Sequence, residues 1–284
     1  MNRYSVKRVS PLLTEIRATY KSVNDVFSFL LCSDVHFDNP KCDRRLFFSH
    51  LSEAKEKKAG ILCFGDFFCL MQGKYDPRRN KSSVRPEHNK ENYLDAVFSD
   101  SADKISDYAK NFLVISDGNH ETAILKNCEV NPLDHLTEKL RYKYNSQVEH
   151  MGYHGFVRFV FENHNGGKIR KCLLYFMHGK YGGTVTKGVL GVNRHGLVVP
   201  QADIVVTGHT HDRWEVSQPR YVLRDNGVLE VGEQLHIKTG TYKEEFAHAG
   251  GWAVERIVMP KSLGGYWLEL SPNLSGVNIR TYKT

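Results

Sequence analysis

Five short apolar runs constrain the fold of this chain more than any other feature. They occupy residues 26–32, 60–64, 111–115, 172–177 and 202–206. Each run is too short and too apolar for a surface helix, and its composition is typical of a strand that is buried on both faces. Amphipathic spacing over residues 43–58 and 92–108 predicts helices that connect these strands. We therefore expect an α/β protein.

A polar motif follows each of these runs. In chain order the motifs are Asp34-Val35-His36, Gly65-Asp66, Gly118-Asn119-His120-Glu121, His178-Gly179 and Gly208-His209-Thr210-His211. Because open α/β sheets bind ligands at the carboxyl ends of their strands, we expect these side chains to meet. Imidazole, carboxylate and amide oxygen all bind divalent ions near neutral pH, and no thiolate is required.

A single carboxylate can hold two ions about 3.5–4 Å apart, because each of its oxygens can bind one of them. Asp66 is our choice for this bridge. Taken alone, a Gly-Asp or an Asp-x-His is ordinary structure, namely a turn after a strand. The order of all five motifs favours a two-metal site instead, and so does the alternation of His209 and His211, which places both rings on one side of an extended segment.

The motifs resemble the signature of the calcineurin-like metallophosphoesterases over roughly residues 26–215. The resemblance implies a four-layer αββα sandwich, in which two mixed β-sheets are flanked by helices. It implies one metal held by Asp34, His36 and His211, a second held by Asn119, His178 and His209, and Asp66 between them. It also implies that His120 is a catalytic imidazole that faces the leaving group.

Residues 65–88 are similar to uncharacterised family members encoded in phage and prophage genomes. One departure from the family pattern is Cys69, where many members have an Asp that orients the catalytic His. A thiol substitutes poorly for a carboxylate. Asp38, Asp117 and Glu121 are the nearby acids, and the sequence leaves open which of them, if any, takes this role.

The expected activity is hydrolysis of P–O ester bonds by a hydroxide that bridges two metals, with no covalent intermediate. His120 then protonates the leaving oxygen. We expect a phosphodiesterase or nuclease. The alternatives are a phosphomonoesterase acting on protein, nucleotide or sugar phosphates, and a non-catalytic binding protein that retains the fold. The ligand types suit Mn, Fe, Zn, Ni or Co, and the resemblance favours two Mn²⁺ ions.

The net charge of +7 favours a polyanionic partner such as nucleic acid, without identifying it. The most basic tract, residues 74–85, begins beside Asp66, and its role stays open between substrate binding and a solvated loop. His195, His248 and residues 240–245 are further candidates for the lining of a cleft.

We expect one domain over residues 1–284, with the catalytic motifs within 26–215 and a β-rich C-terminal elaboration at 216–284. Residues 1–25 predict a short strand and helix, or an irregular segment. No apolar run reaches about 18 residues, and the N-terminus lacks the apolar core of a signal peptide. Six cysteines without a Cys-x-x-Cys pair indicate reduced thiols. We therefore expect a cytoplasmic protein without a membrane or an evident protein partner.

Overall fold

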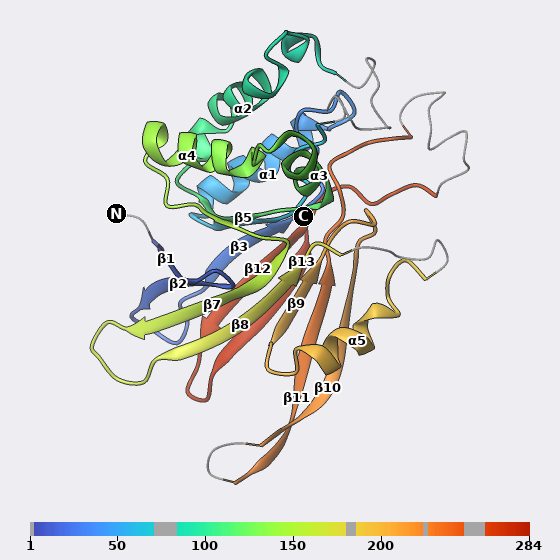
Figure 1. The fold of residues 1–284 in the computed structure, drawn as a ribbon. Coiled ribbons are helices and arrows are strands. Elements are labelled where there is room, and N and C mark those ends of the chain that lie inside the picture. The colour runs from blue at the N-terminus through green and yellow to red at the C-terminus, as the bar shows by residue number, and fades with distance from the viewer. Residues whose placement is uncertain (1–2, 71–83, 180–185, 224–226, 247–258) are drawn as a thin grey trace.

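Two mixed β-sheets pack face to face in this protein (Figure 1). The computed structural model describes residues 3–70, 84–179, 186–223, 227–246 and 259–284. In these residues the first sheet has seven strands in the order β1-β2-β7-β8-β9-β11-β10, and the second has six in the order β13-β12-β3-β4-β5-β6. Helices flank the pair of sheets, so the expected α/β sandwich of two mixed sheets is confirmed.

The predicted apolar runs all form strands. The strands of the first sheet are β1 (Ser5–Ser10), β2 (Leu13–Tyr20), β7 (His154–Asn163), β8 (Arg170–Met177), β9 (Ile204–Thr207), β10 (Trp214–Leu223) and β11 (Leu229–Lys238). Those of the second are β3 (Phe27–Cys32), β4 (Gly60–Phe64), β5 (Phe112–Ser116), β6 (Glu149–Met151), β12 (Tyr266–Pro272) and β13 (Val277–Lys283). Because β3, β4 and β5 are parallel, and β8 and β9 are parallel, their carboxyl ends meet at one edge of each sheet.

The helices form two unequal outer layers (Figure 1). The second sheet is covered by α1 (Arg44–Glu56), α2 (Tyr93–Lys104), α3 (Asn119–Cys128) and α4 (Pro132–Tyr144), with the short 3-10 turns η2 (Pro86–His88) and η3 (Ser106–Tyr108) between them. Only α5 (Gly191–Val198) covers the first sheet among the described residues. No described helix is both long and apolar enough to cross a bilayer.

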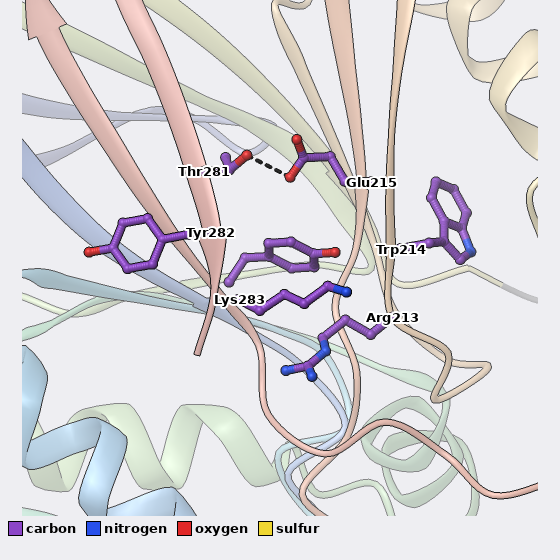
Figure 2. A pocket seen from close by; sticks show the side chains of 7 residues that line it. Arg213, Trp214, Glu215, Thr281, Tyr282 and Lys283 are labelled. Atoms are coloured by element: carbon purple, nitrogen blue, oxygen red, sulfur yellow. Dashed lines mark hydrogen bonds between the residues drawn. The ribbon is translucent and has the colours of Figure 1, made fainter.

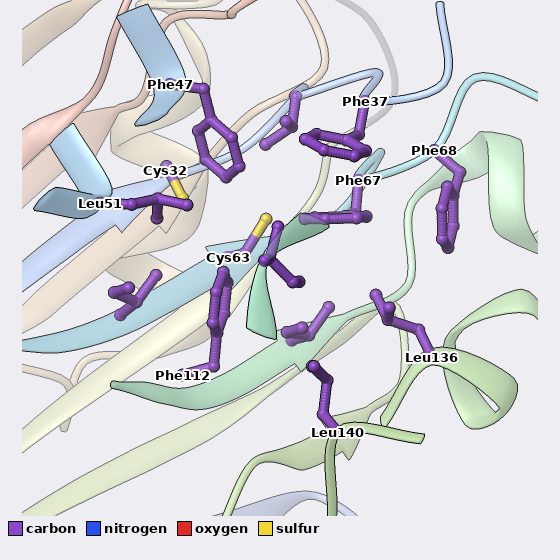
Figure 3. Close-up of a cluster of buried hydrophobic side chains, with 14 of the residues drawn as sticks. Cys32, Phe37, Phe47, Leu51, Cys63, Phe67, Phe68, Phe112, Leu136 and Leu140 are labelled. Carbon is purple, nitrogen blue, oxygen red and sulfur yellow. The ribbon is translucent and has the colours of Figure 1, made fainter. Parts of the chain in front are cut away.

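The buried strands supply side chains to two apolar layers at once. Leu30 and Cys32 of β3 face the helices, whereas Phe29 and Leu31 face the other sheet. Figure 3 shows Cys32 and its neighbours on the helix side, beneath α1. Successive side chains of a strand point to opposite faces, so a strand buried on both faces must be apolar throughout. This requirement explains the continuous apolar runs.

The structure departs from the sequence-based expectation at three places. Residues 5–20 form the antiparallel pair β1 and β2, without the expected helix, because Ile16, Ala18 and Tyr20 enter the core between the sheets with a period of two. Both α5 and β13 were not predicted. The strands after residue 215 join both sheets, and the boundary between the catalytic motifs and the C-terminal elaboration stays a prediction.

Candidate metal centre

The five motifs converge at the carboxyl ends of β3, β4, β5, β8 and β9. Backbone hydrogen bonds join the loops that carry them: the N–H of Asp34 donates to the carbonyl of Gly65 (3.0 Å), and that of His36 donates to the carbonyl of Asp66 (3.0 Å). The Asp34 carboxylate also accepts a hydrogen bond from the backbone N–H of His209 (2.9 Å). Loops that are distant in sequence are therefore held together by main-chain atoms.

One group of side chains consists of Asp34, His36 and His211. Their candidate ligand atoms all lie within 4.8 Å of one another. The Nε2 atoms of His36 and His211 are 3.2 Å apart, and His211 Nε2 lies 3.3 Å from Asp34 Oδ1. These are the three residues that the resemblance assigns to the first metal.

The second group consists of Asp66, His178 and His209, with Asn119 between the two rings. Asn119 Oδ1 lies 2.7 Å from His209 Nδ1 and 3.2 Å from His178 Nε2, which is in turn 3.1 Å from Asp66 Oδ2. The other ring nitrogen of His178 donates to the carbonyl of Phe64 (3.0 Å), so Nε2 is the nitrogen that faces the group.

The two groups are contiguous, and their electrostatics favour positive charge. His178 Nε2 lies 3.9 Å from Asp34 Oδ1, which links the groups. Burial alone would raise the pKa of Asp34 and Asp66, but the His178 imidazole lowers both, that of Asp66 to well below its usual range. Burial would lower the pKa of His178, yet the charges of Asp66 and Asp34 raise it to about 10. Two buried carboxylates thus demand a cation at this position.

The donor atoms fit divalent metal ions. Asp34 Oδ1 is buried and has no hydrogen-bond partner, a state that costs about 1–3 kcal/mol for a neutral group and more for a charged one. Ligand atoms that share an ion at bond lengths of about 2.0–2.2 Å lie about 3–3.5 Å apart. The separations of 3.2 and 3.3 Å in the first group, and of 3.1 Å between His178 and Asp66 in the second, agree with this spacing. The 2.7 Å between Asn119 Oδ1 and His209 Nδ1 is shorter.

The backbone is strained at the predicted ligands. Positive φ angles occur at Asp34 (51°), His36 (49°), Asp66 (50°), His209 (70°) and His211 (59°), all of them non-glycine residues. Each residue held in this left-handed region costs on the order of 1–3 kcal/mol unless its surroundings enforce it, and such residues cluster at functional sites. The tight turns bring successive strand ends close enough for their side chains to meet.

The glycines of the motifs make room for the ligands. A Cβ at Gly118 would lie 2.1 Å from Asp66 Oδ1, and one at Gly65 would lie 2.3 Å from His178 Nδ1. Neither distance is compatible with a side chain. The Gly-Asp and Gly-Asn-His spacings therefore follow from the close approach of carboxylate and imidazole to the backbone.

His120 lies beside the two groups at the start of α3. Its backbone N–H donates to Asp66 Oδ1 (3.0 Å), and its Nε2 lies 3.9 Å from Asp66 Oδ2. The rings of His120 and His36 are 5.0 Å apart between centroids. Its Nδ1 lies 2.5 Å from the carbonyl oxygen of Cys69. A carbonyl only accepts, so Nδ1 carries the hydrogen and Nε2 is the nitrogen that faces the site.

The three acids near Cys69 are all engaged elsewhere. Asp38 accepts from the backbone N–H of Cys69 (2.5 Å) and of the next residue (2.9 Å). Glu121 accepts from the N–H of Gly118 (2.9 Å), at the start of its own helix. Asp117 pairs with His150 (2.9 Å). The contact that orients His120 is therefore the main-chain carbonyl of Cys69.

The Cys69 thiol lies beside the candidate ligands, because its Sγ, one ring nitrogen of His36 and one of His120 are all within 4.8 Å of one another. The thiol accepts a hydrogen bond from Asn39 Nδ2 (3.2 Å), and burial, followed by the nearby Asp38 charge, raises the pKa of the thiol to about 12. The thiol therefore stays protonated near neutral pH.

The segment 239–245 packs against the loop after β3. Thr241 Oγ1 and the N–H of Tyr242 both donate to the carbonyl of Asp34, at 2.8 and 3.1 Å. Lys243 forms an ion pair with Glu245 (2.9 Å), and both side chains are largely buried. Burial and then the charges of His120 and Lys243 lower the pKa of His36.

Lys238 stabilises the loop that carries two of the candidate ligands, and no motif in the sequence identified it. It lies at the end of β11, is buried, and donates from Nζ to the carbonyl of Gly208 (2.7 Å), directly before His209. Burial lowers the pKa of Lys238 to about 8. This ammonium holds the loop that carries His209 and His211.

The remaining sequence candidates are outside the two groups. Most of the basic tract 74–85 lies outside the described residues, and Arg85, which is described, donates to the carbonyl of Asn39 (2.7 Å). His248 also lies outside them. His195 belongs to α5 and to none of the candidate metal groups of the described chain. Another such group is formed by Glu87, His88 and Asp100, and its two carboxylates are ion-paired with Arg44 and Lys104.

Comparisons with known proteins add only remote likenesses. No protein-family model matches the chain, and no curated protein matches it. Vacuolar protein sorting 29 from Cryptosporidium parvum is 15% identical, with 91% of this chain and 98% of that chain covered and a TM-score of 0.37. A predicted phosphoesterase from Streptococcus pneumoniae is 11% identical, with coverages of 91% and 90% and a TM-score of 0.32. Zinc-bound Vps29 from Entamoeba histolytica is 12% identical, with 90% of this chain and 99% of that chain covered and a TM-score of 0.31. At this distance they carry no argument about activity.

Proposed function

We propose that this protein is a metal-dependent phosphoesterase with a dinuclear centre, and that it hydrolyses phosphodiesters, including those of nucleic acid. The observation that supports this proposal most directly is the pair of contiguous donor groups around Asp34 and Asp66. Their carboxylate, imidazole and amide donors suit divalent ions, and two-metal sites of this kind catalyse phosphoryl displacement. The likeness to phage-encoded proteins and the cytoplasmic location stay predictions.

In this proposal the residues divide between the ions as the motifs suggest. One ion is held by Asp34, His36 and His211, the other by Asn119, His178 and His209, and Asp66 lies between them. When bound, the ions lower the pKa of a shared water and neutralise the phosphoryl oxygens. Mn²⁺ is the proposed metal, on the basis of the family resemblance, and Zn, Fe, Co and Ni are the alternatives that the donor set also suits.

His120 acts as the general acid. The carbonyl of Cys69 accepts from its Nδ1–H, so Nε2, which faces Asp66, is the nitrogen that exchanges a proton with the leaving oxygen. The ring is largely buried beside Asp66, with 10% of the side chain exposed, so it is accessible to a substrate but restrained in orientation. This arrangement supplies the function of an Asp-His dyad without the carboxylate.

Lys243 orients the substrate by binding a phosphoryl oxygen. Its ammonium is held by the ion pair with Glu245, and its positive charge lowers the pKa of His36. A nucleic-acid diester is favoured because the net charge of +7 suits a polymer with many phosphates. The role of the basic tract in the same binding is part of the proposal.

The test is Mn²⁺-dependent hydrolysis of p-nitrophenyl phosphate, bis-p-nitrophenyl phosphate, and labelled single- and double-stranded DNA and RNA. Asp66→Asn removes the carboxylate between the two groups, and Asp95→Asn makes the same change on the exposed face of α2 as a matched control. We expect diester cleavage that Asp66→Asn abolishes and Asp95→Asn retains. Cleavage of the monoester alone would indicate a phosphomonoesterase, and a metal-loaded protein inactive on the whole panel would indicate a binding protein.

A further inference from the structure

A cleft lies between the edge strands of the two sheets. It has a volume of ≈ 480 Å³ and lies between β10 of the first sheet and β13 of the second. Figure 2 shows the side chains of Arg213 and Lys283 in this space, with a hydrogen bond between Thr281 and Glu215 across it. The cleft is therefore lined by two cations, and its acid is already engaged.

Arg213 has no counter-ion in the described part of the chain. Its Nη1 is buried and has no hydrogen-bond partner, and no described carboxylate forms an ion pair with its guanidinium. Glu215 accepts from Thr281 Oγ1 (2.5 Å) and makes no ion pair with Arg213. A guanidinium is always charged, and a partly buried charge without a partner is costly. Such a group indicates a site for an anion.

The surroundings of Arg213 are built to accommodate it. A Cβ at Gly264, whose φ is 93°, would lie 3.2 Å from Arg213 Nη1 and 2.4 Å from Thr284 Oγ1. Tyr266 also lines the cleft; the residue is 2% exposed, and its hydroxyl has no hydrogen-bond partner. Two buried donors, one of them permanently charged, thus line the same cleft.

The position of the cleft relates it to the metal centre. Arg213 follows His211 by two residues, so their Cα atoms are at most about 7 Å apart. The intervening Asp212 pairs with Lys261 (3.0 Å). The cleft therefore begins within about 7 Å of a candidate metal ligand, measured between Cα atoms along the chain.

We propose that the Arg213–Lys283 cleft binds a second phosphate group of the substrate, next to the one at the metals. The planar donor fork of arginine matches the oxygens of a phosphate, and Lys283 adds a second positive charge at the opposite strand. This inference rests on the proposed function, because it requires a substrate with more than one phosphate.

The kinetic test compares a substrate that reaches the cleft with one that does not. KM is measured for a fluorescein-labelled dT12 oligonucleotide and for bis-p-nitrophenyl phosphate. In Arg213→Met, we expect the KM for the oligonucleotide, divided by the KM for bis-p-nitrophenyl phosphate, to rise about tenfold. This is the effect of losing one charge-assisted hydrogen bond. Arg280→Met, the same change at an exposed position on β13 with 78% of its side chain accessible, leaves the ratio unchanged. An unchanged ratio in Arg213→Met would overturn the inference.

A binding test separates this inference from the proposed function. Inorganic triphosphate should raise the Tm of the metal-free wild-type protein and of Arg280→Met, but not that of Arg213→Met. Without triphosphate, the Tm of Arg213→Met should be no lower than that of the wild type, because the charge it removes is unpaired. If no substrate is cleaved but this pattern holds, the anion site stands and the hydrolase assignment falls. Equal stabilisation of all three proteins, or a lower Tm of Arg213→Met alone, would contradict the site.

Discussion

Replacing His120 by alanine tests the division of labour between metal binding and proton transfer. The backbone N–H of residue 120, which donates to Asp66 Oδ1 (3.0 Å), is retained in His120→Ala. The lost imidazole lies 3.9 Å from the other oxygen of Asp66, beyond hydrogen-bond range. We therefore expect metal content to be unchanged, while kcat falls about 10²–10⁴-fold, equivalent to about 3–5 kcal/mol of transition-state stabilisation.

The assay measures kcat with two diesters that differ in leaving group. A p-nitrophenolate leaves easily without a proton, whereas the alkoxide of a dinucleotide needs one, so the loss in His120→Ala should be larger for the dinucleotide. Metal content is measured on the same samples. His135→Ala, which removes an exposed histidine of α4, is the control and should retain activity. A loss of metal, or an equal loss of kcat for both leaving groups, would refute the reasoning.

Three further predictions follow from the geometry. Gly118→Ala should weaken Mn²⁺ binding at least about tenfold in a calorimetric titration, because its Cβ would lie 2.1 Å from Asp66 Oδ1 and overpacking of this kind costs about 1–3 kcal/mol; unchanged affinity would count against the role of Asp66. Lys243→Gln should raise KM for bis-p-nitrophenyl phosphate more than it lowers kcat, and the reverse pattern in steady-state kinetics would contradict substrate binding by Lys243. Burial, and then the charge of His195, lower the pKa of His236 to about 4; the folded state resists protonation, so the metal-free protein should lose stability as pH falls from about 6.5 towards 4. Urea unfolding at both ends of that range should show a smaller loss in His236→Gln.

The strands and the convergence of the motifs were predictable because a strand that is buried on both faces has an uninterrupted run of apolar residues. In β3, Phe29 and Leu31 enter one core and Leu30 and Cys32 the other, so no polar residue interrupts the run. Once these runs are strands of parallel sheets, the residues after them must meet at one edge. The glycines of the motifs could also be recognised in the sequence. They are required because Asp66 and His178 lie so close to the backbone at Gly118 and Gly65 that no side chain fits there.

The parts that the sequence did not predict depend on main-chain atoms or on long-range packing. The contact that orients His120 is a carbonyl oxygen, which any residue at position 69 provides. The β1–β2 pair has mixed periodicity, and only its pairing with β7 decides between helix and strand. Lys243 and Arg213 gain their positions from loops that pack on other loops, and no local pattern records such contacts.

The central claim is that two metal ions lie between the donor groups around Asp34 and Asp66. Anomalous diffraction at the manganese edge, from crystals soaked in Mn²⁺, tests it most directly. The account predicts two peaks about 3.5–4 Å apart, one beside His36 and His211 and the other beside His178 and His209, with Asp66 between them. A single peak, or peaks away from these side chains, would contradict it.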